Sequence, residues 1–462
     1  MLVFKSKYIF FFSLIFFIAS CGKESDDTPP DDNGNDTTDI NDGCPELIRV
    51  IEDELAMNDL LDLVQSQTLK YFWDFAEPNS GMARERNTSG NLVTTGGTGF
   101  GIMAMIAGAE RGFIERDDVL ERVLKISNFL KKADRFHGAW SHWIDGTTGQ
   151  ALPFSQKDNG GDLVETAFLV QGLIAAREYF DGGTPLEDSL RALVDTLWYG
   201  VNWQWYTQGQ NVLYWHWSPD FDFEMNMHIS GWNEAMIVYV LAAASPTYPI
   251  TPEVYHNGWA RNGNMVNGRY FYDIQLPLGV DFGGPLFFAH YSFLGLDPRG
   301  LNDQYANYWE QNRRHSLINQ RYAIANPKNF CHYSDSLWGL TASDDPEVGY
   351  QAHAPFGFHG TDNGTITPTA ALSSMPYTPE ESKKALRTFY YYLHDDLWGT
   401  YGFKDAFNLD LNWFANSYLA IDQGPIVVMI ENYRSALLWE VFMRNEDVWN
   451  GLELLEFYYE NH

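Results

Sequence analysis

The sequence has very few cysteines. Three occur in 462 residues, at Cys21, Cys44 and Cys331, and none belongs to a Cys-x-x-Cys pair. No His-Glu-x-x-His segment is present either, so the common zinc-binding patterns are missing and we expect no metal and no cofactor. Cys44 and Cys331 could form one disulfide outside the cytoplasm, but the sequence does not decide whether they pair.

Basic residues are also scarce. The chain has 30 lysines and arginines against 61 aspartates and glutamates, which gives a formal net charge of −31. Phosphate backbones would repel so acidic a protein, and this argues against nucleic acid as a partner.

Only one apolar run is long, and it lies at the start of the chain. Residues 8–18 follow Lys5 and Lys7, but the run is shorter than the roughly 20 residues that a membrane-spanning helix needs. This pattern predicts a secretory signal peptide over residues 1–20. Its end, Ile18-Ala19-Ser20-Cys21, resembles a bacterial lipobox and implies lipidation of Cys21. The alternative is a plain signal peptide followed by an incidental cysteine.

The segment after Cys21 lacks aromatic residues altogether. It reads GKESDDTPPDDNGNDTTDINDG, with eight acidic residues and paired prolines. Such a segment buries too little apolar surface to offset the entropy lost on ordering, so residues 21–45 are predicted to form a disordered tether. Acidic residues directly after a lipidated cysteine also resemble the surface-export signal of Bacteroidetes lipoproteins. We therefore expect an outer-membrane lipoprotein that faces the periplasm or the cell surface.

No second linker interrupts residues 46–462, which are predicted to form a single domain of paired helices. The predicted pairs are 57–76 with 97–110, 117–134 with 162–180, 186–201 with 231–245, 251–259 with 284–296, 303–325 with 367–375, and 379–396 with 424–443, and a last helix follows at 446–460. The first member of a pair is amphipathic and the second is apolar nearly all round. Six wet-faced helices alternating with six buried ones predict an all-α fold, an (α/α)6 barrel of six helical hairpins.

The longer connections precede the buried helices, so a double ring would gather them at one end. Acidic residues occur at that end in three places: Asp158, Asp162 and Glu165 before one helix, Glu234 before the next, and Asp422 before the last. Hydrolysis of a glycosidic bond needs two carboxyl groups, one to protonate the leaving oxygen and one to act as nucleophile or to activate water. Acids that converge from different helices meet that need.

Each acid also has a structural alternative. Asp162 and Glu165 have the spacing of a capping box, and Asp158 could be a solvated loop acid. Glu234 falls in the first turn of its predicted helix, where it could act on the helix dipole alone. Asp422 could be a helix N-cap.

Aromatic residues make up 16% of the chain, and many lie in the predicted loops. Aromatic faces outside a core are typical of sites for ligands with apolar faces and polar edges, such as sugars. The candidate substrate-binding residues are Trp140, His142, Trp143, Glu165, Trp215, His216, Trp217, Trp232 and Asn233. Alternatively, about half of these aromatics wedge the loops together.

Five segments together resemble a known family. They are KDNGGDLVETAFLVQGLIAAREYF, GWNEAMIVYVLAAASP, GPLFFAHYSFLGLDPRG, YGFKDAFN and AIDQGPIVVMIENYRS. They are similar to the glycoamylase-like domain of Bacteroidetes lipoproteins, and specifically to glycoside hydrolase family 144. The resemblance runs from about residue 55 to the end of the chain.

The resemblance implies an (α/α)6 catalytic domain that hydrolyses β-1,2-glucan with inversion, by endo action or by release of sophorose. It also implies that Glu234 is the general acid, and it leaves Asp422, Asp158 and Asp162 eligible as the base. We expect a monomer whose partners are an oligo- or polysaccharide and a lipid anchor. A glycosidase for another glucan linkage and a non-catalytic glycan-binding lipoprotein remain as alternatives.

Overall fold

The structure, a computed structural model, describes residues 43–48, 53–355 and 361–460. The predicted signal peptide, Cys21 and the tether up to residue 42 lie outside these ranges. Residues Gly43–His462 form one compact unit, and the description below is confined to it. Within the described ranges, no helix is both long and apolar enough to cross a membrane.

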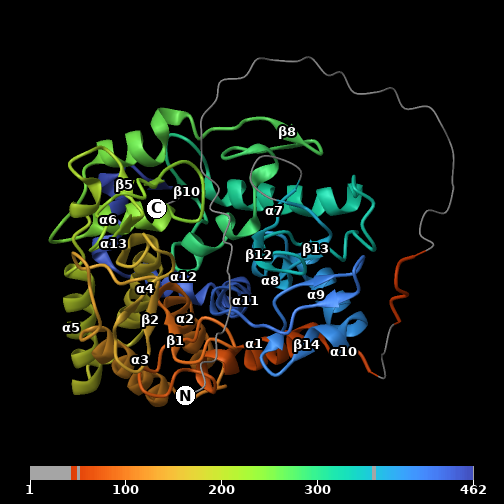
Figure 1. Cartoon of the computed structure of the whole chain (residues 1–462), viewed down its shortest axis with the longest axis horizontal. Helices are drawn as coiled ribbons and strands as arrows, with labels where there is room; N and C mark the ends of the chain where they lie inside the picture. Colours follow the sequence, from red (N-terminus) through yellow and green to blue (C-terminus); the bar gives the residue numbers. More distant parts are fainter. Residues whose placement is uncertain (1–42, 49–52, 356–360, 461–462) are drawn as a thin grey trace, which may run out of the picture. The chain divides into compact units, whose positions relative to one another are not determined.

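The described residues form thirteen α-helices (Figure 1). They are α1 Met57–Trp73, α2 Thr95–Glu110, α3 Arg116–Leu130, α4 Leu163–Tyr179, α5 Pro185–Tyr199, α6 Met236–Ala244, α7 Tyr308–Ala325, α8 Pro368–Ser373, α9 Pro379–Tyr392, α10 His394–Leu397, α11 Ala420–Ser435, α12 Leu437–Phe442 and α13 Glu446–Leu454. Most of the predicted helices therefore exist within a few residues of their predicted bounds.

The helices differ in burial as the sequence predicts. Every residue of α6 is buried and only Arg177 of α4 is not, whereas α3 buries 6 of its 15 residues. The buried helices are neighbours: α2 packs against α4 and α11, α4 also packs against α6, and α11 also packs against α8. The wetter helices lie outside them, with α3 on α5, α1 on α11 and α9 on α8. The unit is thus a helix-rich, two-layered arrangement.

The fourth predicted pair differs from the prediction. The segment Val254–Trp259 forms a single π-helical stretch (η2), and only short 3₁₀ turns, η5 Leu286–Ala289 and η6 Tyr291–Phe293, replace the predicted helix 284–296. Gly284 has a φ of 81° and Pro285 follows it, so no regular helix begins there. The last predicted helix also ends early, because Glu456 adopts a φ of 63°.

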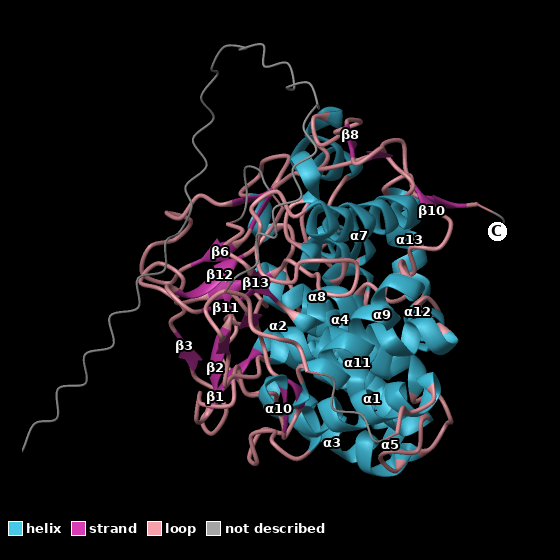
Figure 2. Ribbon diagram, turned by 90° about the vertical axis from the view of Figure 1, so that its right-hand side faces the viewer, coloured by secondary structure: helices cyan, strands magenta, loops and turns pink. Residues whose placement is uncertain are grey.

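Short strands occupy the loops. They are β1 Leu92–Thr94, β2 Trp143–Asp145, β3 Ala151–Leu152, β4 Gly161–Asp162, β5 Leu213–Tyr214, β6 His216–Trp217, β7 His228–Ile229, β8 Tyr270–Phe271, β9 Ile274–Gln275, β10 Leu301–Asn302, β11 Ala342–Asp345, β12 Gly349–Ala352, β13 Thr365–Ile366, β14 Trp398–Gly399, β15 Gly402–Phe403, β16 Phe407–Asn408, β17 Trp413–Phe414 and β18 Tyr458–Tyr459. All the paired strands are antiparallel, and β1, β2, β3, β6, β11, β12 and β13 lie together on one side of the helices (Figure 2). The expectation of an all-α chain holds for the scaffold but not for these loops.

Helices α2 and α4 touch backbone to backbone. A Cβ atom on Gly99 would lie 2.1 Å from the carbonyl oxygen of Phe168, and one on Gly172 would lie 2.2 Å from the carbonyl oxygen of Gly99. Contacts this short exclude any side chain at either position. The absence of two side chains therefore fixes the separation of the two helices whose N-termini carry the site described below.

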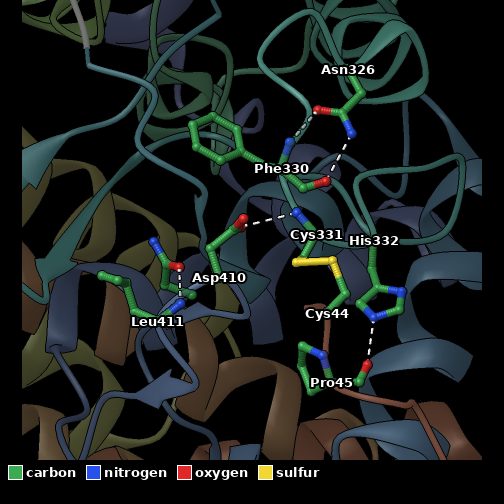
Figure 3. Close-up of a disulfide and its surroundings, with 9 residues drawn as sticks. Cys44, Pro45, Asn326, Phe330, Cys331, His332, Asp410 and Leu411 are labelled. Carbon is green, nitrogen blue, oxygen red and sulfur yellow. Dashed lines mark hydrogen bonds between the residues drawn. A yellow bond between two sulfur atoms is a disulfide. The ribbon is translucent and has the colours of Figure 1, made fainter. Parts of the chain in front are cut away.

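Cys44 and Cys331 form a disulfide with a Cα–Cα distance of 5.5 Å (Figure 3). The surrounding chain reinforces this junction, because Nε2 of His332 lies 2.7 Å from the carbonyl oxygen of Pro45 and the Cys331 N–H donates to Asp410. The pairing that the sequence left open is thereby settled. It joins the start of the described chain to the connection between α7 and β11.

Candidate active site

Short strand pairings bring two histidines to the start of α4. Strand β4 pairs with β6 so that Asp162 lies opposite His216, and the Leu163 N–H donates to the Trp215 carbonyl. On the other side, the Thr95 N–H donates to the carbonyl of His142, which ties that loop to the start of α2. The loops before α2, α4 and α6 are therefore joined by backbone hydrogen bonds around one position.

The two glycines of the DNGGD segment permit this close approach. A Cβ atom on Gly160 would lie 2.3 Å from the Trp217 carbonyl oxygen, and one on Gly161 would lie 2.0 Å from the hydroxyl of Tyr206. Only glycine fits at either position, so these residues let β4 lie against β6. Asp158 and Asp162 are thereby held on either side of the turn.

Asp162 is both a helix cap and a partner of His142. Its Oδ1 accepts hydrogen bonds from the N–H groups of Val164 and Glu165 at 3.0 and 2.9 Å, and its Oδ2 lies 3.1 Å from Nδ1 of His142. Burial alone would raise the pKa of Asp162, but the hydrogen bond to His142, the neighbouring charges and the Glu165 N–H together outweigh burial and lower the pKa. Asp162 is therefore a fixed, fully buried negative charge.

Glu165 does not complete a capping box with Asp162. Its Oε2 instead accepts a 2.7 Å hydrogen bond from the N–H of Gly96 and a weaker one from the hydroxyl of Thr94, both at the start of α2. Burial raises its pKa, although the charge of His142 opposes that rise. Glu165 thus connects the N-termini of two neighbouring helices, and the predicted box is wrong.

His142 is surrounded by carboxylates. Burial opposes its charged form, but the charges of Glu165 and Asp162 outweigh burial and raise the pKa of His142 to about 10. Potential ligand atoms of His142, Asp158 and Asp162 lie within 4.8 Å of one another, a spacing that a cation could use. With a pKa this high, His142 is protonated at neutral pH and forms an ion pair with the carboxylates around it.

Asp158 is a buried acid, not the solvated loop residue of the alternative. Only 4% of its surface is exposed, and its Oδ2 lies 3.3 Å from Nε2 of His216. Burial and then the charge of Asp162 raise the pKa of Asp158 to about 7. Burial also lowers the pKa of His216 to about 4, so this histidine is neutral at pH 7. Asp158 therefore changes between its protonated and its ionised form near neutral pH.

Glu234 lies in the turn directly before α6, two residues before the helix in which it was predicted. The hydroxyl of Ser292 donates to the Glu234 carbonyl and accepts from the Ile237 N–H, which holds this turn against η6. Burial, followed by the charges of Glu165 and Asp162, raises the pKa of Glu234 to about 7. A carboxyl group that keeps its proton near neutral pH has the property a general acid requires.

Asp422 lies in the first turn of α11, and it is not an N-cap. It is 1% exposed, and burial followed by the nearby Asp405 raises its pKa well above the usual value. Burial and the charge of Asp344 raise the pKa of Asp405 to about 7. Burial and then the charges of nearby groups, including Asp422 and Glu234, raise the pKa of Tyr291. Tyr291 therefore lies near both acids.

Two of the predicted substrate-binding aromatics are core residues. Trp140 is fully buried and its indole N–H donates to the Leu130 carbonyl, while Trp232 is 5% exposed and stacks on Tyr308. Neither presents a ring face to solvent, so the prediction is corrected for both. Asn233 accepts a hydrogen bond from the Ala235 N–H and so shapes the turn that carries Glu234.

Three other predicted aromatics remain partly exposed beside the histidines. The ring of Trp143 meets that of His142 edge-on, Trp215 stacks beside His216, and Trp217 meets His137 edge-on. His137 in turn stacks on Trp205 at 3.8 Å between ring centroids. These rings form an aromatic border along one side of the acidic cluster.

Asp405 is the residue that the sequence does not reveal. It lies in the YGFKDAFN segment, where nothing distinguishes it from an ordinary loop acid. Its partner Asp422 is 17 positions away, and its other neighbour, Asp344, is 61 positions away. Only the fold brings the three carboxyl groups together.

Comparisons with known proteins identify the family of this chain. Residues 226–446 match the Glycoamylase family, described as "Putative glucoamylase". The chain is 50% identical over 418 residues to an exo β-1,2-glucooligosaccharide sophorohydrolase (non-reducing end) of Parabacteroides distasonis. The match covers 86% of this chain but 58% of the length of that relative.

Solved structures give fuller coverage. An endo-β-1,2-glucanase from Chitinophaga pinensis, in complex with sophorotriose and glucose, is 53% identical with a TM-score of 0.85, and the match covers 88% of this chain and 99% of that one. A β-1,2-glucanase from Parabacteroides distasonis is 48% identical with a TM-score of 0.84, over 87% and 60% of the two chains. The chain therefore belongs to the glycoamylase-like family, glycoside hydrolase family 144.

Proposed function

We propose that this chain is a glycosidase that hydrolyses β-1,2-glucan and inverts the anomeric centre. The observation that carries the proposal is Glu234, a carboxyl group whose pKa is raised to about 7 by burial and by the neighbouring Glu165 and Asp162. The names of the relatives, a sophorohydrolase and two β-1,2-glucanases, support the linkage.

In this mechanism Glu234 protonates the leaving glycosidic oxygen, and Asp422 accepts a proton from the attacking water. Asp162 is not suited to accept that proton, because both of its oxygens already accept hydrogen bonds. Instead, Asp162 and Glu165 hold the charged His142 in place to bind substrate hydroxyls. Asp158 is buried against His216 and serves the same binding role. Trp143, Trp215 and Trp217 supply ring faces for the sugar.

The same proposal includes a closed (α/α)6 barrel. The Ile237 N–H of α6 donates to the hydroxyl of Ser292, and Nε2 of His290 lies 3.0 Å from the hydroxyl of Ser374, just after α8. The segment with η5 and η6 thus contacts both α6 and the end of α8, which supports a ring in which 3₁₀ turns stand in for the fourth inner helix. An experimental structure with a gap between α6 and α8 would contradict closure.

We further propose an outer-membrane lipoprotein anchored through Cys21, with the folded unit acting as a monomer. The disulfide between Cys44 and Cys331 supports an oxidising location outside the cytoplasm. Lipid labelling of the protein and of its Cys21→Ala variant in a bacterial host tests the anchor, and an unlabelled wild-type protein would refute it. The molar mass from light scattering tests whether the folded unit is a monomer.

The activity is tested with linear β-1,2-glucan, laminarin and starch, with reducing ends followed over time. We expect the wild-type protein to cleave only β-1,2-glucan, and we expect Glu234→Gln to lose at least about 10²-fold in kcat, as removal of a general acid does. The matched control is Glu121→Gln, which makes the same change on the exposed face of α3 and should keep full activity.

Each of the other outcomes would assign the protein a different activity. Cleavage of starch or laminarin would assign another linkage and overturn the proposal. Binding of β-1,2-glucan without turnover would identify a glycan-binding lipoprotein. The sizes of the first products distinguish endo action, which gives mixed lengths, from exo action, which gives sophorose alone.

A further inference from the structure

Two buried aspartates from separate segments meet beside the first turn of α11. Asp405, between β15 and β16, is 2% exposed and Asp422 is 1% exposed. The two side chains are close enough for each to shift the pKa of the other, and we call them the aspartate pair. A hydrogen bond between two carboxyl groups requires a proton on one of them.

The aspartate pair has almost no other hydrogen-bond donors. Oδ2 of Asp405 accepts a 2.7 Å hydrogen bond from the Asp344 N–H. Within the described part of the chain, Oδ1 of Asp405 and both carboxyl oxygens of Asp422 receive no hydrogen bond from an N–H or hydroxyl group. Buried oxygens left without donors are costly, and a shared proton satisfies two of them at once.

The charges around the aspartate pair also favour one retained proton. The Asp344 carboxylate adds a second negative charge, while Arg86 opposes it. The guanidinium of Arg86 is already engaged by Glu85 and Asp344, at 2.9 and 3.0 Å. The phenols of Tyr291 and Tyr350 also face the pair. Burial keeps both neutral, so neither balances a second negative charge.

We propose that Asp405 is a positioning residue that shares one proton with Asp422, so that the pair as a unit accepts the proton of the attacking water. The proposal rests on the glycosidase function proposed above and specifies how its base works. Asp405 acts through Asp422 and does not touch the substrate.

The step balances as follows. The singly ionised pair takes one proton from water as the water oxygen bonds to the anomeric carbon. The bond between that carbon and the glycosidic oxygen breaks, and Glu234 gives its proton to the leaving oxygen. The pair is then neutral and Glu234 is ionised. One proton passes to solvent from the pair and one returns to Glu234 before the next turnover.

The pH profile of kcat/KM for Asp405→Asn tests the proposal. In the singly ionised pair Asp405 carries the proton, so asparagine removes no charge there. It replaces a carboxyl O–H by a weaker N–H donor, and the pKa of Asp422 should rise. We expect the acid limb of the profile to move to higher pH by about one unit, with kcat reduced by about 10- to 100-fold and KM changed by less than about twofold. Asp395→Asn, the same change at an exposed position of α10, should leave the profile unchanged.

A purely structural role predicts a different result. Loss of packing would lower kcat or the amount of folded protein at every pH without moving the acid limb, and an unmoved limb would overturn the proposal. If Asp405→Asn does not fold, Asp344→Asn serves in its place. It removes a negative charge beside the pair while Arg86 remains, so the pair ionises more readily and the limb should move to lower pH. No shift in that variant would equally refute the proposal.

Infrared spectroscopy with isotope-labelled aspartate reads the shared proton without any substrate. Above the acid limb of each protein, a protonated aspartate carbonyl band should persist in the wild-type protein and be lost in Asp405→Asn. An active enzyme without this band would overturn the shared proton and leave the glycosidase function standing. A band in a protein that cleaves no glucan would instead overturn the function.

Discussion

Nδ1 of His142 lies 3.1 Å from Oδ2 of Asp162, while the other oxygen of the same carboxylate caps α4. One side chain therefore fixes both the helix start and a histidine of the candidate site. Helix capping and a role in the site are compatible here, because the two oxygens of the carboxylate face different partners. The cap gives this charge a rigid position, which a site that must orient a sugar requires.

The double role of Asp162 can be separated by substitution. Asp162→Ala loses both the cap and the ion pair, so we expect its free energy of unfolding to fall by about 2–5 kcal/mol. Asp162→Asn keeps a capping oxygen and should lose less. Chemical denaturation measures both, with Thr184→Ala, which removes the cap of α5, as a control that should cost about 1 kcal/mol. Equal losses in Asp162→Ala and Thr184→Ala would show that the ion pair contributes nothing.

In the proposed mechanism, the pKa of Glu234 sets the alkaline limb of activity. Because burial raises that pKa to about 7, the general acid loses its proton as the pH rises through 7. We expect kcat to decline above about pH 7 by tenfold for each further pH unit. Initial rates on β-1,2-glucan from pH 5 to 9 measure this limb, and a flat profile to pH 9 would exclude Glu234 as the acid.

The same shift predicts that Glu234 destabilises the fold at alkaline pH. Its folded pKa of about 7 exceeds the ordinary value of 4.5. The contribution of Glu234 to folding stability is therefore fully present below pH 4.5 and is lost as the pH rises through 7. Glutamine stays neutral throughout. Glu234→Gln should therefore match the wild-type free energy of unfolding at pH 4 and exceed it by about 1–3 kcal/mol at pH 8. The Glu121→Gln control should show no such divergence, and a variant less stable than wild type at pH 8 would contradict the prediction.

The disulfide makes a separate contribution to stability. It closes a loop over a sequence separation of 287 residues, which restricts the unfolded chain. We expect the Cys44→Ser, Cys331→Ser double variant to lose about 2–5 kcal/mol of unfolding free energy. Dithiothreitol should lower the stability of the wild-type protein to that of the variant and leave the variant unchanged. Insensitivity of the wild-type protein to the reductant would show that the bond adds no stability.

The helix pattern could be predicted because burial repeats along the chain. The apolar faces of α2, α4, α6 and α11 are local in sequence, and so are the wet faces of α3 and α5. The fourth pair failed where Gly284 and Pro285 prevent a regular helix from starting, a local signal that its apolar pattern hides. Its 3₁₀ turns are then held by tertiary contacts: His290, between η5 and η6, is buried against Ser374, which the sequence does not indicate.

The candidate site was predictable where its acids lie next to helix starts. Asp158 and Asp162 were located by their position before an apolar helix. Trp140 was misassigned because an aromatic residue in a loop looks the same in sequence whether its ring is buried or exposed. Asp405 was missed because its importance comes from a contact with Asp422, and such long-range pairings leave no mark in a single sequence.

The disulfide at Cys44 also has a mechanical consequence. A pull on the chain ahead of Cys44 passes through a covalent bond directly to Cys331, and not through the hydrogen bonds and apolar contacts of the helices between them. The load enters the fold at the connection between α7 and β11, which lies far along the sequence from the N-termini of α2 and α4, where His142 and Asp162 meet.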